Sequence, residues 1–193
     1  QLALATTAGP VALSSTSVGG QIGGLLEFRT RVLDPARAEL GRIATAFASS
    51  FNATQQAGVD YNGNAGAAFF SLPSPRVNAL QANSGTATLS ASVADVGTLQ
   101  GADLAMKFDG TTWKATRADT GGALTMTGTG TAADPFLVSG LSLVVSGAAA
   151  AGDRFAVSPT MGAAAGIRVA LQDPAGIAAA APLQARADVA NLG

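Results

Sequence analysis

A long amphipathic segment, residues 35–57, dominates the N-terminal third of this sequence. Its large apolar residues recur at intervals of three and four positions, at Leu40, Ile43, Phe47 and Phe51. This spacing places them on one face of an α-helix and predicts a buried seam. The helix would be about 34 Å long at ~1.5 Å per residue, which exceeds what a small β domain needs for its own packing. The segment therefore predicts a rod that packs against other helices.

A shorter helical pattern, from Gly20 to Leu33, precedes the rod. Between the two patterns, Asp34 offers an N-cap acceptor, and Pro35 suits the first helical position but disfavours helical geometry at Asp34. The sequence thus predicts a helix pair or one kinked helix. Gly58 is expected to end the rod in a left-handed C-cap conformation. Residues 2–13, which contain a proline, predict an extended lead-in.

Beyond Pro75 the apolar period falls toward two, which predicts β structure. The Asp109-Gly110 pair predicts a tight hairpin that places Trp113 in the core. Near the end, Asp173-Pro174 predicts a helix of at most about two turns. The candidate strands are Thr86–Val93, Asp103–Phe108, Thr112–Ala118, Ala123–Thr127, Phe136–Val138, Leu141–Val145, Arg154–Ser158 and Ile167–Leu171.

The predicted fold class is α+β, in which a long N-terminal amphipathic helix pair, or one kinked helix, is joined to a mostly antiparallel β domain. Residues 1–70 are expected to form the rod-like helical segment with its lead-in. Residues 71–193 are expected to form a mostly β outer domain.

The stretch GVDYNGNAGAAFFS places Asp60, Asn62 and Asn64 at alternate positions, as a calcium loop does. That loop requires glycine at its sixth position and a bidentate glutamate at its twelfth, where this chain has Ala65 and Ser71. A single carboxylate among neutral amides is a weak calcium site, so the stretch predicts a turn. After this turn, Phe69 and Phe70 are expected to re-enter an apolar interior.

Composition excludes several classes of function. Charged residues make up 12% of the chain, and the 11 Lys and Arg are scattered, so no basic footprint for nucleic acid exists. No apolar run reaches the roughly 18 residues of a membrane span. Without histidine or cysteine, the serine triad and the common zinc sites are impossible. The aspartates sit mostly at turns and caps, so we expect no catalytic residues, metal or cofactor.

Four blocks of the sequence follow one another in an order that resembles a known family: GGLLEFRTRVLDPARAELGRIATAFASSFNATQQAGVDYNGNAGAAFFS, MKFDGTTWKATR, GLSLVVSGAAAAGDRFAVSP and IRVALQDPAGIAAAAP. From about Gly19 to Pro182, the chain resembles the family of flagellar hook-associated protein 1. The members of this family are hook-filament junction proteins. The resemblance implies a non-enzymatic structural protein of the bacterial flagellum, exported by the flagellar secretion apparatus. Its expected partners are copies of itself and neighbouring axial proteins.

The resemblance further implies that residues 19–58 belong to a rod-like inner domain and that the region after Phe70 forms an outer β domain. Terminal helical segments of the family, which lie outside this chain, would cover the apolar seam, and Phe47→Asp would be the most damaging single change. Two alternatives are another axial hook or hook-associated protein and an extracellular adhesin or carbohydrate-binding β domain. An enzyme is the most remote alternative.

Overall fold

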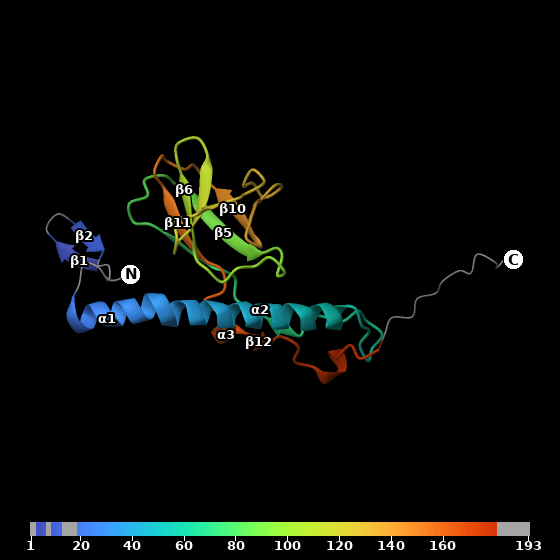
Figure 1. Cartoon of the computed structure of the whole chain (residues 1–193). Coiled ribbons are helices and arrows are strands. Elements are labelled where there is room, and N and C mark those ends of the chain that lie inside the picture. The colour runs from blue at the N-terminus through green and yellow to red at the C-terminus, as the bar shows by residue number, and fades with distance from the viewer. Residues whose placement is uncertain (1–2, 7–8, 13–18, 181–193) are drawn as a thin grey trace.

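The computed structural model describes residues 3–6, 9–12 and 19–180. They form a long helical rod with a β body above it in the view of Figure 1. Ahead of the rod, β1 (Ala3–Thr6) and β2 (Gly9–Ala12) pair as an antiparallel hairpin. The predicted extended lead-in is therefore a small hairpin of two strands within its described part.

The rod is one continuous helical stretch composed of α1 (Gly20–Phe28), a π-helical turn (Arg29–Leu33) and α2 (Asp34–Gln56). Asp34 has helical dihedral angles, φ −67° and ψ −43°, and its N–H donates to the carbonyl of Arg29, five residues back. The prediction of Asp34 as an N-cap is therefore wrong. Pro35 lacks an N–H, and its ring crowds the preceding turn of a regular α-helix. The wider π turn makes room for that ring, so the helix continues.

The end of the rod also differs from its prediction. Gly58 does not adopt a left-handed conformation. A Cβ at Gly58 would instead lie 2.5 Å from the carbonyl oxygen of Ala178. Glycine is therefore needed here because a second segment of the chain approaches the backbone closely. The predicted left-handed C-cap is wrong because the chain leaves the helix at Ala57, which keeps helical dihedral angles.

Residues 76–158 form the β body, which consists of two antiparallel sheets. The larger sheet has the strand order β4-β11-β6-β7-β8 and the smaller one has the order β5-β10-β9. The bounds are β4 (Arg76–Ala79), β5 (Thr88–Val93), β6 (Leu104–Phe108), β7 (Trp113–Arg117), β8 (Ala123–Leu124), β9 (Phe136–Val138), β10 (Leu141–Ser146) and β11 (Arg154–Ser158). Each strand predicted in this region is present, and β4 was not predicted.

Alternate residues of the strands point inward and form the core between the two sheets. The most deeply buried large side chains are Leu104, Met106, Leu141, Leu143 and Val157. Trp113 is half-buried at the edge of this core, with its ring centroid 5.2 Å from that of Phe108 and 5.7 Å from that of Phe155.

Two turns fix the strand register. The Asp109-Gly110 hairpin is confirmed: Asp109 Oδ1 accepts from the N–H groups of Thr111 and Thr112 at 2.9 and 2.8 Å, and Phe108 pairs with Trp113. Between β9 and β10, Ser139 and Gly140 both have positive φ, 49° and 81°. Two consecutive positive φ values define a type I′ turn, which matches the right-handed twist of the strands it joins.

After β11 the chain returns to the rod. Residues 160–180, here called the strap, contain α3 (Ala163–Gly166), β12 (Arg168–Val169) and a 3-10 turn (Pro174–Gly176). In Figure 1, α3 and β12 lie below α2, opposite the β body. β12 pairs with β3 (Phe70–Ser71), and Asp173 caps the 3-10 turn. The expected outer domain, residues 71–193, is thus not all in the β body, because the strap belongs with the rod.

Candidate functional site

The rod has two apolar faces that differ in side-chain size. One face carries Ala38, Gly41, Thr45 and Ala48, all buried. Thr160 of the strap crosses this face and donates from Oγ1 to the carbonyl oxygen of Ala38 at 2.6 Å. Small residues allow the two backbones to approach each other closely, so the strap docks on this small-residue face.

The other face carries the large apolar side chains of the rod, and they are exposed. In α2, Leu40, Ile43, Phe47 and Phe51 share one face because they are spaced three and four positions apart. Further exposed apolar residues continue along α1 and the π turn. The set, called the apolar face below, is Ile22, Leu25, Phe28, Val32, Leu40, Ile43, Phe47 and Phe51. Its exposed fractions run from 42% at Phe51 to 69% at Leu25. An apolar run of this length on a surface marks an interaction site.

The predicted seam residues therefore lie on a different face of the rod from the one that Thr160 of the strap crosses. Leu40, Ile43, Phe47 and Phe51 are 58%, 55%, 56% and 42% exposed, so nothing in the described residues buries them fully. The expectation of a buried seam does not describe this chain by itself. That segments outside this chain cover the seam stays a prediction.

Four of the predicted site residues meet at the far end of α2. The ring centroids of Phe51 and Phe69 are 5.0 Å apart, those of Phe47 and Phe70 are 5.5 Å apart, and those of Phe69 and Phe70 are 4.8 Å apart. Phe69 and Phe70 are half-buried. Beside this cluster, a groove of about 470 Å³ runs between Phe47 and Phe51 of α2 and Ile177 of the strap. Trp113 lies apart from the cluster, in the β body.

Asn52 holds the aromatic cluster in place. Its Oδ1 accepts from the N–H groups of Phe69 and Phe70 at 2.9 and 2.8 Å, and its Nδ2 donates to the carbonyl oxygen of Phe70 at 2.8 Å. Sequence analysis did not predict this role of Asn52. Its helical position gave no specific signal, because only the fold brings β3 beside it.

We expect Asn52→Ala to lower the free energy of unfolding by about 2 kcal/mol, because three hydrogen bonds to half-buried backbone groups would be lost. Chemical denaturation of both proteins measures the change. Thr54→Ala is the matched control: its hydroxyl is exposed and bonds within the helix, to the carbonyl of Ser50, so the change should stay within about 0.5 kcal/mol. Equal losses in the two variants would contradict the role given to Asn52.

The turn predicted at residues 58–64 is confirmed. Asp60 Oδ1 accepts from the N–H groups of Asn62 and Asn64 at 2.9 and 2.7 Å. The N–H of Tyr61 donates to the carbonyl of Ala175 at 3.0 Å, which ties the turn to the strap. Across the described ranges, no three His, Cys, Asp or Glu side chains gather in a way that would hold a metal ion.

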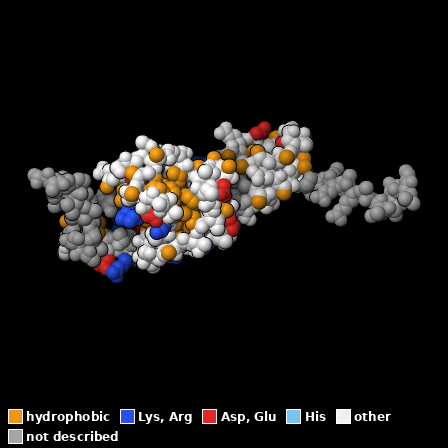
Figure 2. Space-filling model, turned by 90° about the horizontal axis from the view of Figure 1, so that it is seen from above, with side chains coloured by type: hydrophobic (Ala, Val, Ile, Leu, Met, Phe, Trp, Pro, Cys, Tyr) orange, Lys and Arg blue, Asp and Glu red, His pale blue; other side chains and the backbone are white. Residues whose placement is uncertain are grey.

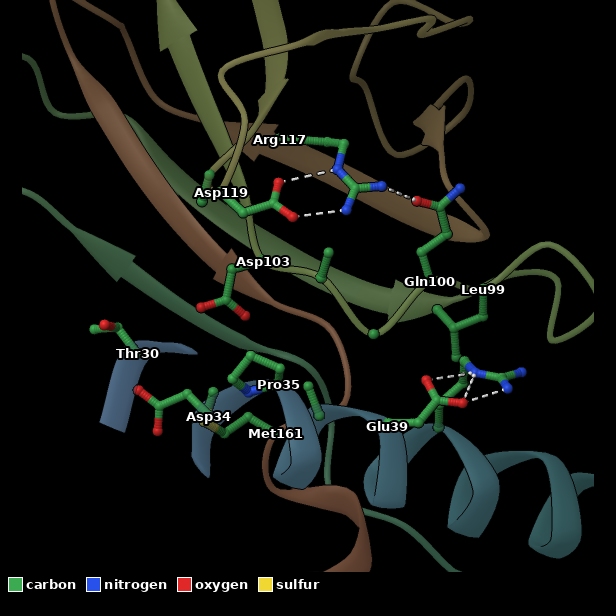
Figure 3. A pocket seen from close by; sticks show the side chains of 15 residues that line it. Thr30, Asp34, Pro35, Glu39, Leu99, Gln100, Asp103, Arg117, Asp119 and Met161 are labelled. Carbon is green, nitrogen blue, oxygen red and sulfur yellow. Dashed lines mark hydrogen bonds and ion pairs between the residues drawn. The ribbon is translucent and has the colours of Figure 1, made fainter. Parts of the chain in front are cut away.

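A cleft of about 700 Å³ separates the rod from the β body (Figure 3). On the rod wall, Arg42 Nε is bonded to Glu39 at 2.9 Å. On the β-body wall, Arg117 donates to Asp119 at 2.7 Å and to Gln100 at 3.3 Å. Each guanidinium is thus neutralised on its own side of the cleft.

Asp103, on the β-body wall, faces Asp34 of the rod across the cleft (Figure 3). Its Oδ1 is buried and has no hydrogen-bond partner among the described residues. Burial raises the pKa of Asp103 above its ordinary value, and the negative charge of Asp34 raises it further. The opposite shift occurs at Asp119, whose pKa is held low by the Arg117 side chain.

We expect Asp103→Asn to raise the melting temperature at pH 7 by a few degrees. A carboxyl whose pKa is raised in the fold contributes stability in its protonated form below its unfolded pKa, and this contribution is lost as pH rises through the folded pKa. The gain in melting temperature should therefore disappear below about pH 3.5, where the Asp103 carboxyl is protonated in both the folded and the unfolded chain. Asp119→Asn is the control and should not stabilise at pH 7, since the pKa of Asp119 is lowered. A gain that is independent of pH would contradict this assignment.

The rest of the surface carries little charge. In the view from above, charged groups on the described residues are few, and most of the surface is backbone and uncharged side chains (Figure 2). Within the ranges the structure describes, no helix has both the length and the hydropathy needed to cross a membrane. A rod with an exposed apolar face that carries a separate β body has the form of a structural subunit.

Two family models match this chain in sequence order. The model described as the helical domain of flagellar hook-associated protein FlgK matches residues 1–70, and the D2-like domain of flagellar hook-associated protein 1 matches residues 78–159. Together they cover the rod and the β body. The chain belongs to the flagellar hook-associated protein 1 (FlgK) family.

Individual relatives agree with the two family models. Flagellar hook-associated protein 1 of Salmonella typhimurium is 38% identical over 171 residues, which is 88% of this chain and 31% of the relative. The Escherichia coli protein of the same name is 35% identical over 83% of this chain and 29% of its own length. The flagellar hook junction protein FlgK from Burkholderia pseudomallei superposes with a TM-score of 0.80 and 40% identity, over 90% of this chain and 32% of that structure. The chain thus spans about a third of each of these relatives.

Proposed function

We propose that this chain is part of a structural protein of the bacterial flagellum that works at the junction between hook and filament. The observation that carries the proposal is the ordered match of rod and β body to both FlgK family models. The Burkholderia pseudomallei protein with the same architecture is described as a flagellar hook junction protein. We infer the same place of action for this chain.

The proposed mode of action is subunit packing without catalysis. The apolar face of the rod supplies the surface for packing, because its large side chains are exposed here. Segments of the same protein that lie outside this chain would cover this face and bury Leu40, Ile43, Phe47 and Phe51 as a seam. The low charge of the surface suits closely stacked subunits, which would otherwise have to desolvate charged groups.

The proposed partners are copies of the same protein and the neighbouring axial proteins on the hook and filament sides. The proposed location is extracellular, in the flagellum, after export by the flagellar secretion apparatus. Within this arrangement, the rod and strap would belong to an inner domain and the β body to an outer domain.

Deletion of the encoding gene in its host tests the proposal. We expect cells that build hooks but no filaments, release filament protein into the medium and do not swim. Expression of the intact gene from a plasmid should restore filaments and swimming. Normal filaments and normal swimming in the deletion strain would refute a junction role and would favour an adhesin instead.

A further inference from the structure

The β body meets the rod across a cleft rather than through a shared sheet or layer. Among the described residues, no hydrogen bond or ion pair joins residues 76–158 to the rod or the strap. The ion pairs of the cleft each stay on one wall. Two close approaches are seen. Gly101 of the β body lies against Ala38 of the rod, where a Cβ at Gly101 would be 3.5 Å from the Ala38 Cβ, and the Arg76 side chain lies beside Gly162 of the strap, where a Cβ would be 3.3 Å from Arg76 Nε.

Two short segments connect the β body to the rod, and they lie side by side. Arg76 and Ser158 are the last paired residues of strands β4 and β11, and the hydrogen-bonded ladder ends there. Directly outside this last pair, the chain continues through Pro75 on one side and Pro159 on the other. Because proline has no N–H, neither residue can donate to a strand ladder that would stiffen the connection.

Both segments are fixed to the rod again within a few residues. Thr160 is 1% exposed and bonded to the carbonyl of Ala38, and β3 is held by Asn52 and by β12. The stretches of chain between the β body and these attachment points are therefore short, and both start at the same end of the larger sheet. Short paired connections of this kind are where a hinge between rigid bodies absorbs its dihedral changes.

We propose that the β body rocks on the rod as a rigid unit about the paired segments at Pro75 and Pro159, with Gly101 and Ala38 as a point of contact. The cleft supplies the room for this motion, since it is open and about 700 Å³ in volume. The carboxylates of Asp34 and Asp103 face each other across it and oppose closure. This hinge does not depend on the proposed function.

Residual dipolar couplings measured by NMR on the 193-residue chain test the hinge. If the β body rocks, the alignment tensors fitted separately to the β body and to α2 differ in magnitude. The α2 helix and the strap serve as the internal control, because they should share one tensor. A single tensor that fits the β body and α2 equally well would overturn the proposal.

A disulfide offers a matched second measurement, since the chain contains no cysteine of its own. The 3.5 Å separation between Cβ positions suits a disulfide in the double variant Ala38→Cys and Gly101→Cys. Oxidation should merge the two tensors into one, and reduction should separate them again. Tensors that do not change on oxidation would count against the hinge. If the double variant does not fold, the measurement on the unmodified chain is sufficient to test the hinge.

Discussion

Gly41→Ala is expected to lower the free energy of unfolding by about 3 kcal/mol. A Cβ at this position would overlap the backbone carbonyl oxygen of Thr160. The carbonyl cannot easily move away, because Thr160 is 1% exposed and its hydroxyl is bonded to Ala38 on the same helix. The strap would have to lift from the small-residue face, and its contacts with α2 would be lost.

Gly24→Ala is the matched control for this change. Gly24 also lies in the rod, in α1, but has no atom within 4 Å of its built Cβ. Alanine has the higher helix propensity, so this variant should gain up to about 1 kcal/mol of stability. Urea denaturation of the two variants and the unmodified chain gives both differences. Equal stability of the unmodified chain and Gly41→Ala would show that the strap does not pack as described.

The sequence predicted the elements well where a local pattern decides the structure. The spacing of Leu40, Ile43 and Phe47 is helical in any context, and the alternation in Leu104–Phe108 predicts a strand in any sheet. Asp109 with Gly110 likewise specified its hairpin, since a positive φ of 109° at Gly110 is available to glycine without strain.

Long-range packing was harder to predict from the same residues. Gly58 resembles a C-cap because glycine commonly ends helices, but here it makes room for Ala178, about 120 positions later in the chain. Asn52 and Gln55 look like solvent-facing helix positions, although Gln55 is 5% exposed and donates to the carbonyl of Gly176 at 2.7 Å. A local pattern contains no information about which distant segment arrives.

The direction of burial on the rod illustrates the same limit. A pattern of large apolar residues identifies a face that water disfavours, but does not identify what covers it. Within this chain the buried face is the one with Ala38 and Ala48, because the strap packs by close backbone approach. Nothing in the described residues fully covers the large apolar face, which we propose is left for a partner.

Phe47→Asp should therefore have very different effects in two settings. In this chain, Phe47 is 56% exposed and packs on Phe51 and Phe70, so we expect a loss of about 1 kcal/mol. In the whole protein, where we propose that the face is covered, a carboxylate would be buried in an apolar seam at a cost of about 3–5 kcal/mol. That loss is a large fraction of the roughly 5–15 kcal/mol by which a typical domain is stable, so cells carrying the variant should not swim.

The comparison of the two settings separates a covered face from a merely exposed one. Thermal unfolding of this chain and of the whole protein, each with and without Phe47→Asp, measures the two losses. Tyr61→Asp serves as the control, because the Tyr61 side chain is 89% exposed on the turn beyond the rod and should tolerate the carboxylate in both settings. Ile43→Asp, 55% exposed in this chain, should behave like Phe47→Asp in the whole protein. If neither seam variant changes the whole protein more than it changes this chain, the apolar face has no partner within the protein, and its exposure requires another explanation.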